Sequence, residues 1–381
     1  MIELGKRYEE ANPGVSVEIF WGYDMNKLIT SIIGGQSADI VQVQGDWVNS
    51  LALQGLLLPV NEMAERADLS FDAYYPPLMT QLELDGRRYG LPFTVNPHFA
   101  IYWNKATLDE IGVDSETGPE WFEDLRSFHD RITSIGSDGR LQRVGMQPWD
   151  AGHFANAQFY WSGFFGNTFY DPATGTFHLN DAGGVEGLEW MLGFLEHFTF
   201  GEAWQQPFRP RPNAIAHGHI GMAIAVPEWV SGSIRDFPEV EYGVRVVPER
   251  AAGGSLGDFL AGAVLAVPST AGEFNPLAWD FLKFATASEE GSLVLSNNGL
   301  FPPYRESSVL FEWARDPVMA PFVELAQRAT RGRPSVEDTN YVTQTLNQAV
   351  SSVLEKQQTP TAALDEANRR VQSYFDELRS K

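Results

Sequence analysis

The chain has 381 residues, which is more than one hydrophobic core usually serves, so two lobes are expected. Its 27 Lys and Arg against 50 Asp and Glu leave a net charge of −23, which repels nucleic acid and anionic membrane surfaces. Because the sequence contains no Cys, disulfides, thiolate metal sites and cysteine nucleophiles are excluded. No apolar run approaches the ~18 residues that a membrane helix needs.

The first residues predict a helix from Ile2 to Ala11, which Asn12-Pro13-Gly14 ends. Met1 leads directly into charged residues and not into an apolar segment, so we expect no signal peptide at this start. The alternation of Val15, Val17 and Ile19 with polar residues then predicts a strand.

Strands and helices continue to alternate along the chain, as is typical of a parallel α/β sheet. Further strands are predicted at 39–44, 99–103, 222–226 and 261–267, with a hairpin turn at Asp85-Gly86. Apolar stripes predict helices around residues 28–33, 121–132, 185–195, 279–284, 342–353 and 364–375. No repeat or long linker separates two halves, so we expect the lobes to be interleaved along the chain.

One string resembles the nucleophile motif of an esterase. Residues 253–257 read Gly-Gly-Ser-Leu-Gly, but the motif requires a strand before it and a helix after it. Here a loop precedes the string and an apolar strand follows, and every His lies at or before His219. The pattern favours a plain glycine-rich loop, and we predict no catalytic residue there.

His217 and His219 would lie on one face of a strand, where they could offer two imidazoles to a metal. No third ligand stands nearby, and the sequence contains no motif for a nucleotide or another cofactor. We therefore predict neither a metal nor a cofactor. A glycosidase remains an alternative, with Asp46 and Glu228 as candidate carboxylates, although their spacing does not distinguish an acid from a nucleophile.

Aromatic residues beside polar ones are the more specific signal. Eleven Trp and 25 Phe exceed what a core of this size requires, so some should line a binding surface. A sugar ring offers an apolar face to an indole or phenol and a rim of hydroxyls to carboxylates, amides or imidazoles. The candidate ligand-binding residues of this kind are Trp21, Tyr23, Asp46, Trp47, Asn96, His98, Trp149, Asp150, His153, Glu228, Trp229, Asp258 and Phe259.

An ordered set of motifs also resembles the family 1 extracellular solute-binding proteins of ABC importers, which include maltose-binding protein. The resemblance covers nearly the whole chain, and its order is more specific than any single motif. It rests on residues 8–17 (YEEANPGVSV), 37–41 (SADIV), 45–47 (GDW), 53–60 (LQGLLLPV), 85–92, 102–105 (YWNK), 119–125 (PEWFEDL), 221–229 and 359–367 (TPTAALDEA).

The resemblance implies a periplasmic-binding-protein-like fold, in which two α/β lobes close on a ligand held between them. Residues 1–104 and 258–302 would form lobe one, and residues 105–257 and 303–381 lobe two. Asp46 and Trp47 fall where maltose-binding protein places a sugar-binding acid and its neighbour, and Trp229 falls on a stacking tryptophan. Trp47 replaces a basic residue there, which speaks against a maltose-type ligand.

The resemblance further implies an extracytoplasmic monomer, periplasmic or attached to the cell surface, that works with the membrane permease subunits of an ABC importer and is not an enzyme. The family begins with a signal peptide and a first strand, whereas this sequence starts inside the next helix. We therefore expect a truncated or misassigned start, with the first strand missing and an exposed sheet edge in lobe one.

The same family also includes carriers of glycerol-3-phosphate and other polar solutes, which remain an alternative. A phosphate would call for arginines at the site, and Arg305, Arg209 and Arg211 are the candidates. The acidic balance of the chain favours a neutral mono- or oligosaccharide, which the protein would hold without changing it.

Overall fold

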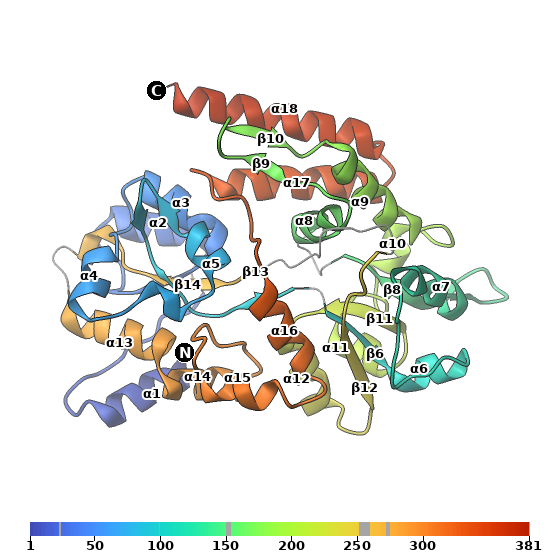
Figure 1. Cartoon of the computed structure of the whole chain (residues 1–381), viewed down its shortest axis with the longest axis horizontal. Coiled ribbons are helices and arrows are strands. Elements are labelled where there is room, and N and C mark those ends of the chain that lie inside the picture. The colour runs from blue at the N-terminus through green and yellow to red at the C-terminus, as the bar shows by residue number, and fades with distance from the viewer. Residues whose placement is uncertain (23, 99, 150–153, 251–259, 272–274, 381) are drawn as a thin grey trace. The chain divides into compact units, whose positions relative to one another are not determined.

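The computed structural model (Figure 1) describes residues 1–22, 24–98, 100–149, 154–250, 260–271 and 275–380. Its contacts divide the chain into two compact units. Unit 1 comprises Met1–Asn96, Leu260–Arg315 and Ala329–Asn340, and unit 2 comprises Pro97–Phe259, Asp316–Arg328 and Tyr341–Lys381. The predicted α/β class, with two units interleaved along the chain, is confirmed.

The contact-based units place residues 97–104 in unit 2 and residues 303–315 and 329–340 in unit 1. Lobes are bodies that move together on ligand binding, which is a different property from contact density. The lobe boundaries drawn from the family resemblance therefore stay a prediction.

Unit 1 is built from eight described helices and several short strands. The helices are α1 (Ile2–Ala11), α2 (Met25–Ile33), α3 (Gly45–Leu53), α4 (Asn61–Arg66), α5 (Pro76–Gln81), α13 (Pro276–Ala287), α14 (Glu289–Ser296) and α15 (Ser308–Trp313), with 3-10 turns at Phe71–Ala73 and Ser269–Ala271. The strands are β1 (Val41–Gln44), β2 (Glu83–Leu84), β3 (Arg87–Arg88), β4 (Leu91–Pro92), β13 (Leu260–Ala261) and β14 (Ala263–Ala266), and β5 (Asn96–Pro97) spans the boundary to unit 2.

The main sheet of unit 1 has the order β1-β14-β4. β14 pairs antiparallel with both neighbours, so β1 and β4 run in the same direction with the returning strand between them. The prediction of a purely parallel sheet is therefore wrong here, because chain order cannot show that a strand from residue 263 onward inserts between two earlier ones. The hairpin at Asp85-Gly86 is confirmed, and both residues have the positive φ that such a turn requires.

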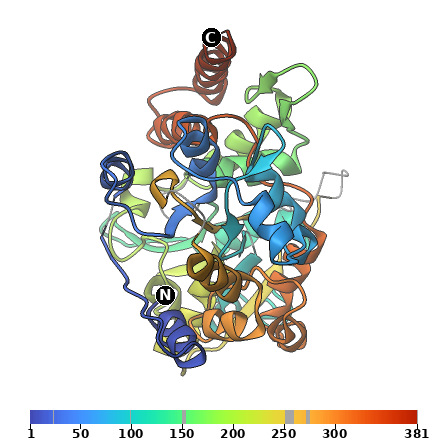
Figure 2. The ribbon, with the colours of Figure 1, turned by 90° about the vertical axis from the view of Figure 1, so that its left-hand side faces the viewer.

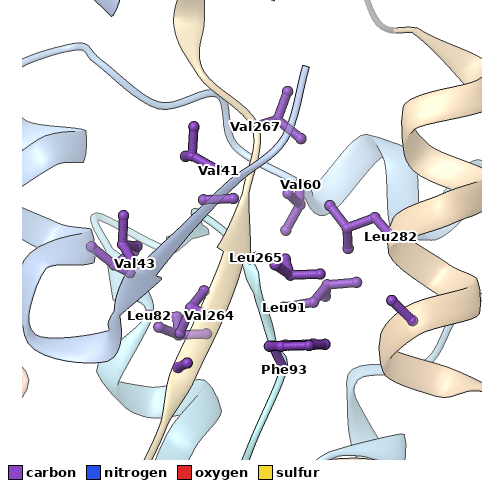
Figure 3. Close-up of a cluster of buried hydrophobic side chains, with 14 of the residues drawn as sticks. Val41, Val43, Val60, Leu82, Leu91, Phe93, Val264, Leu265, Val267 and Leu282 are labelled. Atoms are coloured by element: carbon purple, nitrogen blue, oxygen red, sulfur yellow. The ribbon is translucent and has the colours of Figure 1, made fainter. Parts of the chain in front are cut away.

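Figure 3 shows the core of this unit, where Val264 and Leu265 of β14 point to opposite faces of the sheet. Leu265 and Leu282 of α13 are both fully buried, as is Leu91 of β4. Helix α1 lies beside α13 and α14 in both ribbon views (Figure 2), and its Tyr8 ring meets Phe281 edge-on at 5.2 Å. The helix predicted over Ile2–Ala11 is confirmed with the same bounds.

The strand predicted over residues 15–19 is not formed. Val15, Val17 and Ile19 are half-buried and the residues between them are exposed, so the alternation of burial is real. Instead of joining a ladder, the Val17 amide donates to Glu9 Oε1 at 2.7 Å, and its side chain packs toward Gly5 of α1. The alternation of apolar and polar residues therefore predicted a half-buried extended segment correctly. It could not show whether a neighbouring strand pairs with that segment.

Unit 2 contains a five-stranded sheet and a separate hairpin. Its strands are β6 (Ala100–Asn104), β7 (Ser134–Ile135), β8 (Leu141–Gln147), β9 (Phe169–Asp171), β10 (Thr176–His178), β11 (Ile220–Ala225) and β12 (Tyr242–Val246). Its helices are α6 (Lys105–Glu110), α7 (Phe122–Ile132), α8 (Phe154–Phe164), α9 (Ala182–Gly193), α10 (Phe200–Ala203), α11 (Pro212–Ala216), α12 (Pro227–Asp236), α16 (Ala320–Arg328), α17 (Thr339–Leu354, whose first two residues lie in unit 1) and α18 (Pro360–Arg379).

The sheet of unit 2 has the order β12-β6-β11-β8-β7. β11 pairs parallel with β8 and antiparallel with β6, so this sheet is also mixed. Helix α18 runs along the β9–β10 hairpin (Figure 1), and its Gln372 side chain accepts a hydrogen bond from the Phe177 amide at 2.9 Å. The C-terminal helix thus covers strand edges that would otherwise be unpaired.

Aromatic rings fill much of the unit 2 core. Trp161 packs against Trp190 with ring centroids 4.1 Å apart, and Phe122 stacks on Phe164 at 5.5 Å. Trp103, Trp149 and Trp161 are almost completely buried. The large number of aromatic residues therefore reflects core packing more than an exposed binding surface, which the composition alone did not distinguish.

Candidate functional site

Unit 1 carries an acid and a tryptophan directly after β1. Gly45, Asp46 and Trp47 form the first turn of α3, so the strand delivers them to the end of the sheet where α/β proteins usually bind ligands. The Gly45 amide donates to Gly262 O at 3.0 Å, which ties this turn to the segment before β14. A small hollow lined by Gly45, Gln81 and Gly262, among others, lies beside it.

Asp46 is paired with an arginine that the sequence interpretation did not select. Asp46 Oδ1 lies 3.5 Å from Arg333 Nη1, and the two side chains are only 9% and 6% exposed. Asp46 also occupies the first turn of a helix, where the macrodipole favours a negative charge. Trp47 is half-buried and packs against the unit 1 core. No periodic pattern surrounds Arg333, and only the structure shows its distance from Asp46.

Unit 2 carries the same arrangement after β11. Pro227, Glu228 and Trp229 form the first turn of α12, so an acid and a tryptophan again occupy the second and third helical positions. Glu228 is exposed and Trp229 is half-buried. The ring of Trp229 is therefore partly accessible, and the carboxylate beside it is open to solvent.

The other candidates in unit 1 lie on separate segments. Trp21 stands on the loop between α1 and α2 and is 63% exposed. Asn96 is half-buried at the start of β5. Arg305 is exposed, its amide donates to Ala73 O at 3.0 Å and its guanidinium lies 5.7 Å from the Tyr75 ring, so it is attached to the 71–75 segment.

Two further candidates in unit 2 are buried. Trp149 is 1% exposed, its Nε1 donates to Gln147 Oε1 at 3.1 Å, and its ring meets Phe200 edge-on. His98 follows β5 and is 7% exposed. Trp149 is thus held as a core residue, with both its ring and its N–H engaged.

Five candidates, Tyr23, Asp150, His153, Asp258 and Phe259, lie outside the described residues, as does the glycine-rich string at 253–257. Among the phosphate candidates, Arg209 lies 5.0 Å from the Trp204 ring and Arg211 caps α11. The Arg209 side chain is thus held by a local contact, whereas Arg211 is exposed and its side chain makes no cap hydrogen bond.

The prediction that His217 and His219 share a strand is wrong. His217 is the C-cap of α11, Gly218 has a φ of 66°, and β11 begins only at Ile220. The helix continues to residue 216 because its apolar residues Ala214 and Ile215 are buried. No group of three metal-ligating side chains occurs among the described residues. Nor is any described helix both long and apolar enough for a membrane crossing.

Comparisons with known proteins agree with this architecture. The profile of the bacterial extracellular solute-binding proteins matches residues 1–291. The maltotriose-binding protein of Pyrococcus abyssi is 24% identical over 330 residues, which is 86% of this chain and 68% of that protein.

Two solved structures have the same fold at low sequence identity. A mannotriose-bound protein superimposes with a TM-score of 0.83 at 20% identity and covers 97% of this chain and 95% of its own. UgpB of Mycobacterium tuberculosis, solved with glycerophosphocholine, gives 0.80 at 18% identity and covers 99% and 95%. With a family profile that spans three quarters of its length, this chain belongs to the bacterial extracellular solute-binding proteins.

Proposed function

We propose that this protein captures a neutral mono- or oligosaccharide outside the cytoplasm and delivers it, unchanged, to the permease of an ABC importer. The observation that carries the proposal is the repeated acid–tryptophan pair. Asp46-Trp47 and Glu228-Trp229 each open the helix that follows a sheet strand, one pair in each unit.

An acid at the second helical position is by itself explained by the helix dipole. The helix dipole does not account for the tryptophan that follows; Trp47 packs in part against the unit 1 core, and both indoles are only half-buried, so each keeps an accessible part. The pairing supplies what a sugar requires, which is an apolar ring for its C–H face and a carboxylate for its hydroxyls. Trp21, 63% exposed on another loop of unit 1, would add a second stacking surface.

The comparisons support this choice of ligand class. The relative from Pyrococcus abyssi is named for maltotriose, and one structural neighbour was solved with mannotriose. Because another structural neighbour was solved with glycerophosphocholine, the test also includes phosphate-bearing solutes. Two of the arginines proposed for a phosphate, Arg209 and Arg305, are held by local contacts in this chain, which favours the sugar.

The test is the shift in melting temperature of the purified protein with maltotriose, mannotriose, a set of monosaccharides, glycerol-3-phosphate and glycerophosphocholine. A ligand at about 100 times its dissociation constant adds about 2.7 kcal/mol, which raises the transition by several degrees. We expect a shift with one class of sugar and recovery of that sugar intact after incubation. A shift with only the phosphate compounds would contradict the sugar assignment, and a cleaved sugar would contradict the role as a carrier.

Trp229→Ala should remove most of the sugar-induced shift, because the partly exposed indole would provide the stacking face. Trp121→Ala is the matched control: Trp121 also lies at a helix start in unit 2 and is 66% exposed, but it is not among the proposed site residues. Equal losses in the two variants would show that the effect is not specific to the site.

A further inference from the structure

A charge pair in unit 1 bears on which sugars the proposed site accepts. Arg333 lies on residues 329–340, a part of unit 1 that the chain reaches from α16 and leaves into α17.

The backbone around Arg333 is tied to unit 1 on both sides. The Leu260 amide donates to Arg331 O at 3.0 Å on one side. On the other, Ser335 Oγ donates to Thr80 O at 2.8 Å, and Asn49 Nδ2 donates to Val336 O at 3.1 Å. Asn49 belongs to α3, the helix that also carries Asp46. The guanidinium is therefore presented to Asp46 by a fixed segment.

Because Asp46 and Arg333 are buried, the electrostatic interaction between their charges is strong. Asp46 and Arg333 are 9% and 6% exposed, so water screens them weakly. The pair formed by Arg88 and Glu83 on the β2–β3 hairpin of the same unit is 29% and 40% exposed, where screening is much stronger. A buried charge that loses its partner is strongly unfavourable, and another charge of suitable sign that reaches it is correspondingly attracted.

We propose that Arg333 is a specificity-determining residue: by balancing the charge of Asp46 it makes the protein accept neutral sugars and discriminate against aminated and acidic ones. This inference rests on the proposed function, because it takes Asp46 as a ligand-binding acid. Without Arg333, the carboxylate would favour an ammonium group on the ligand. Without Asp46, the guanidinium would favour a carboxylate or phosphate.

The test measures the affinity of three sugars that differ mainly in charge: mannose, mannosamine and mannuronate, with the glucose series measured in parallel. Tryptophan fluorescence or calorimetry gives the dissociation constants for the wild type, Arg333→Gln, Asp46→Asn and the double variant. We expect the wild type to bind the neutral sugar best. In Arg333→Gln the affinity for the aminated sugar relative to the neutral one should rise about tenfold, and in Asp46→Asn the relative affinity for the acidic sugar should rise similarly.

The double variant replaces both charges by amides and should restore the preference for the neutral sugar, a rescue that a purely structural role would not produce. Arg88→Gln removes the same charge from a pair outside the site and should leave all three relative affinities unchanged. Measured melting temperatures without sugar show which variants are folded.

The inference is overturned if both single variants keep the relative affinities of the wild type, whatever happens to their absolute affinities. It is also overturned if the wild type itself binds mannosamine or mannuronate more tightly than mannose, an outcome that needs no variant to fold. If the wild type responds to no sugar at all, the proposed function fails first and the inference falls with it.

Discussion

At the scale of single residues, two acids in the same helix position differ in burial and therefore in the partners that their carboxylates can reach. Asp46 and Glu228 occupy equivalent helix positions, yet one is buried against an arginine and the other is exposed. The sequence identified both acids, but it contained no signal for Arg333, because the contact joins positions that are far apart in the chain.

His129 makes stability depend on pH. It is fully buried on α7, its Nδ1 accepts a hydrogen bond from the Met146 amide at 3.0 Å, and its ring meets Phe194 edge-on at 4.9 Å. Burial lowers the pKa of His129 from 6.5 to about 4; the nearby Asp130 carboxylate opposes this shift and the Arg126 guanidinium adds to it.

Because the unfolded chain takes up a proton at this residue near pH 6.5 and the folded one does not until about pH 4, protons favour the unfolded chain. The stabilisation is complete above pH 6.5 and is lost as the pH falls toward 4. We predict that between pH 7 and 5 this group lowers the free energy of unfolding by about 2 kcal/mol.

Urea unfolding at the two pH values checks this prediction for the wild type and for His129→Leu. The variant should lose the contribution of His129 to the pH dependence, although it is less stable at pH 7. His217→Gln serves as the control, because His217 is exposed and is not among the charged groups that act on His129. An unchanged pH dependence in His129→Leu would contradict the account.

A substitution at Leu265 tests how the core of unit 1 is packed. It lies fully buried in β14, between β1 and β4. Leu265→Ala should lower the free energy of unfolding by about 2–5 kcal/mol through lost burial and a residual cavity. Leu277→Ala on α13, where the side chain is 52% exposed, should change it by less than about 0.5 kcal/mol. Urea midpoints at constant slope provide the measurement, and similar values for the two variants would contradict the placement of β14.

At the scale of elements, hydrophobic periodicity located seven helices (α1, α2, α7, α9, α13, α17 and α18) and several strands, and strand pairing was the part that it could not show. Helix α1 and the Asp85-Gly86 hairpin have the predicted positions. The run at 261–267 was predicted as one strand, yet it divides at Gly262 into β13 and β14. The break occurs where the backbone at Gly262 approaches the backbone at Thr94, and a local sequence pattern cannot show such a long-range approach.

Gly262 is the residue that this approach requires. A Cβ added there would lie 2.0 Å from Thr94 O, and the Gly262 carbonyl accepts the Gly45 amide at 3.0 Å. Gly262→Ala should therefore force the backbones apart and cost about 1–3 kcal/mol of unfolding free energy.

Gly232→Ala is the comparison for that change. Gly232 lies inside α12, and its nearest neighbour to a new Cβ would be the end of the Arg235 side chain at 3.8 Å. Alanine there should leave stability unchanged or raise it by up to about 1 kcal/mol. Thermal unfolding distinguishes the two, and a tolerated Gly262→Ala would show that the backbones at Gly262 and Thr94 do not approach as described.

At the scale of the whole molecule, the α/β architecture agrees with the family to which the chain belongs. Its two interleaved units were predictable from length, from the lack of a linker and from the order of motifs. The candidate site was predictable only in part: the acid–tryptophan pairs stood out as strand-end residues, whereas the burial of Trp149 depends on its contact with Phe200. The excess of aromatic residues gave no means of separating core from surface.

We propose that the protein binds one neutral sugar and releases it unchanged. Calorimetric titration with maltotriose and mannotriose, followed by chemical analysis of the recovered sugar, tests it most directly. We expect saturable binding of at least one of these sugars, or of a monosaccharide from the same panel, near one molecule per chain, with the sugar recovered intact and no heat from glycerol-3-phosphate. Saturable binding of glycerol-3-phosphate without any sugar response, or hydrolysis of the sugar, would contradict it.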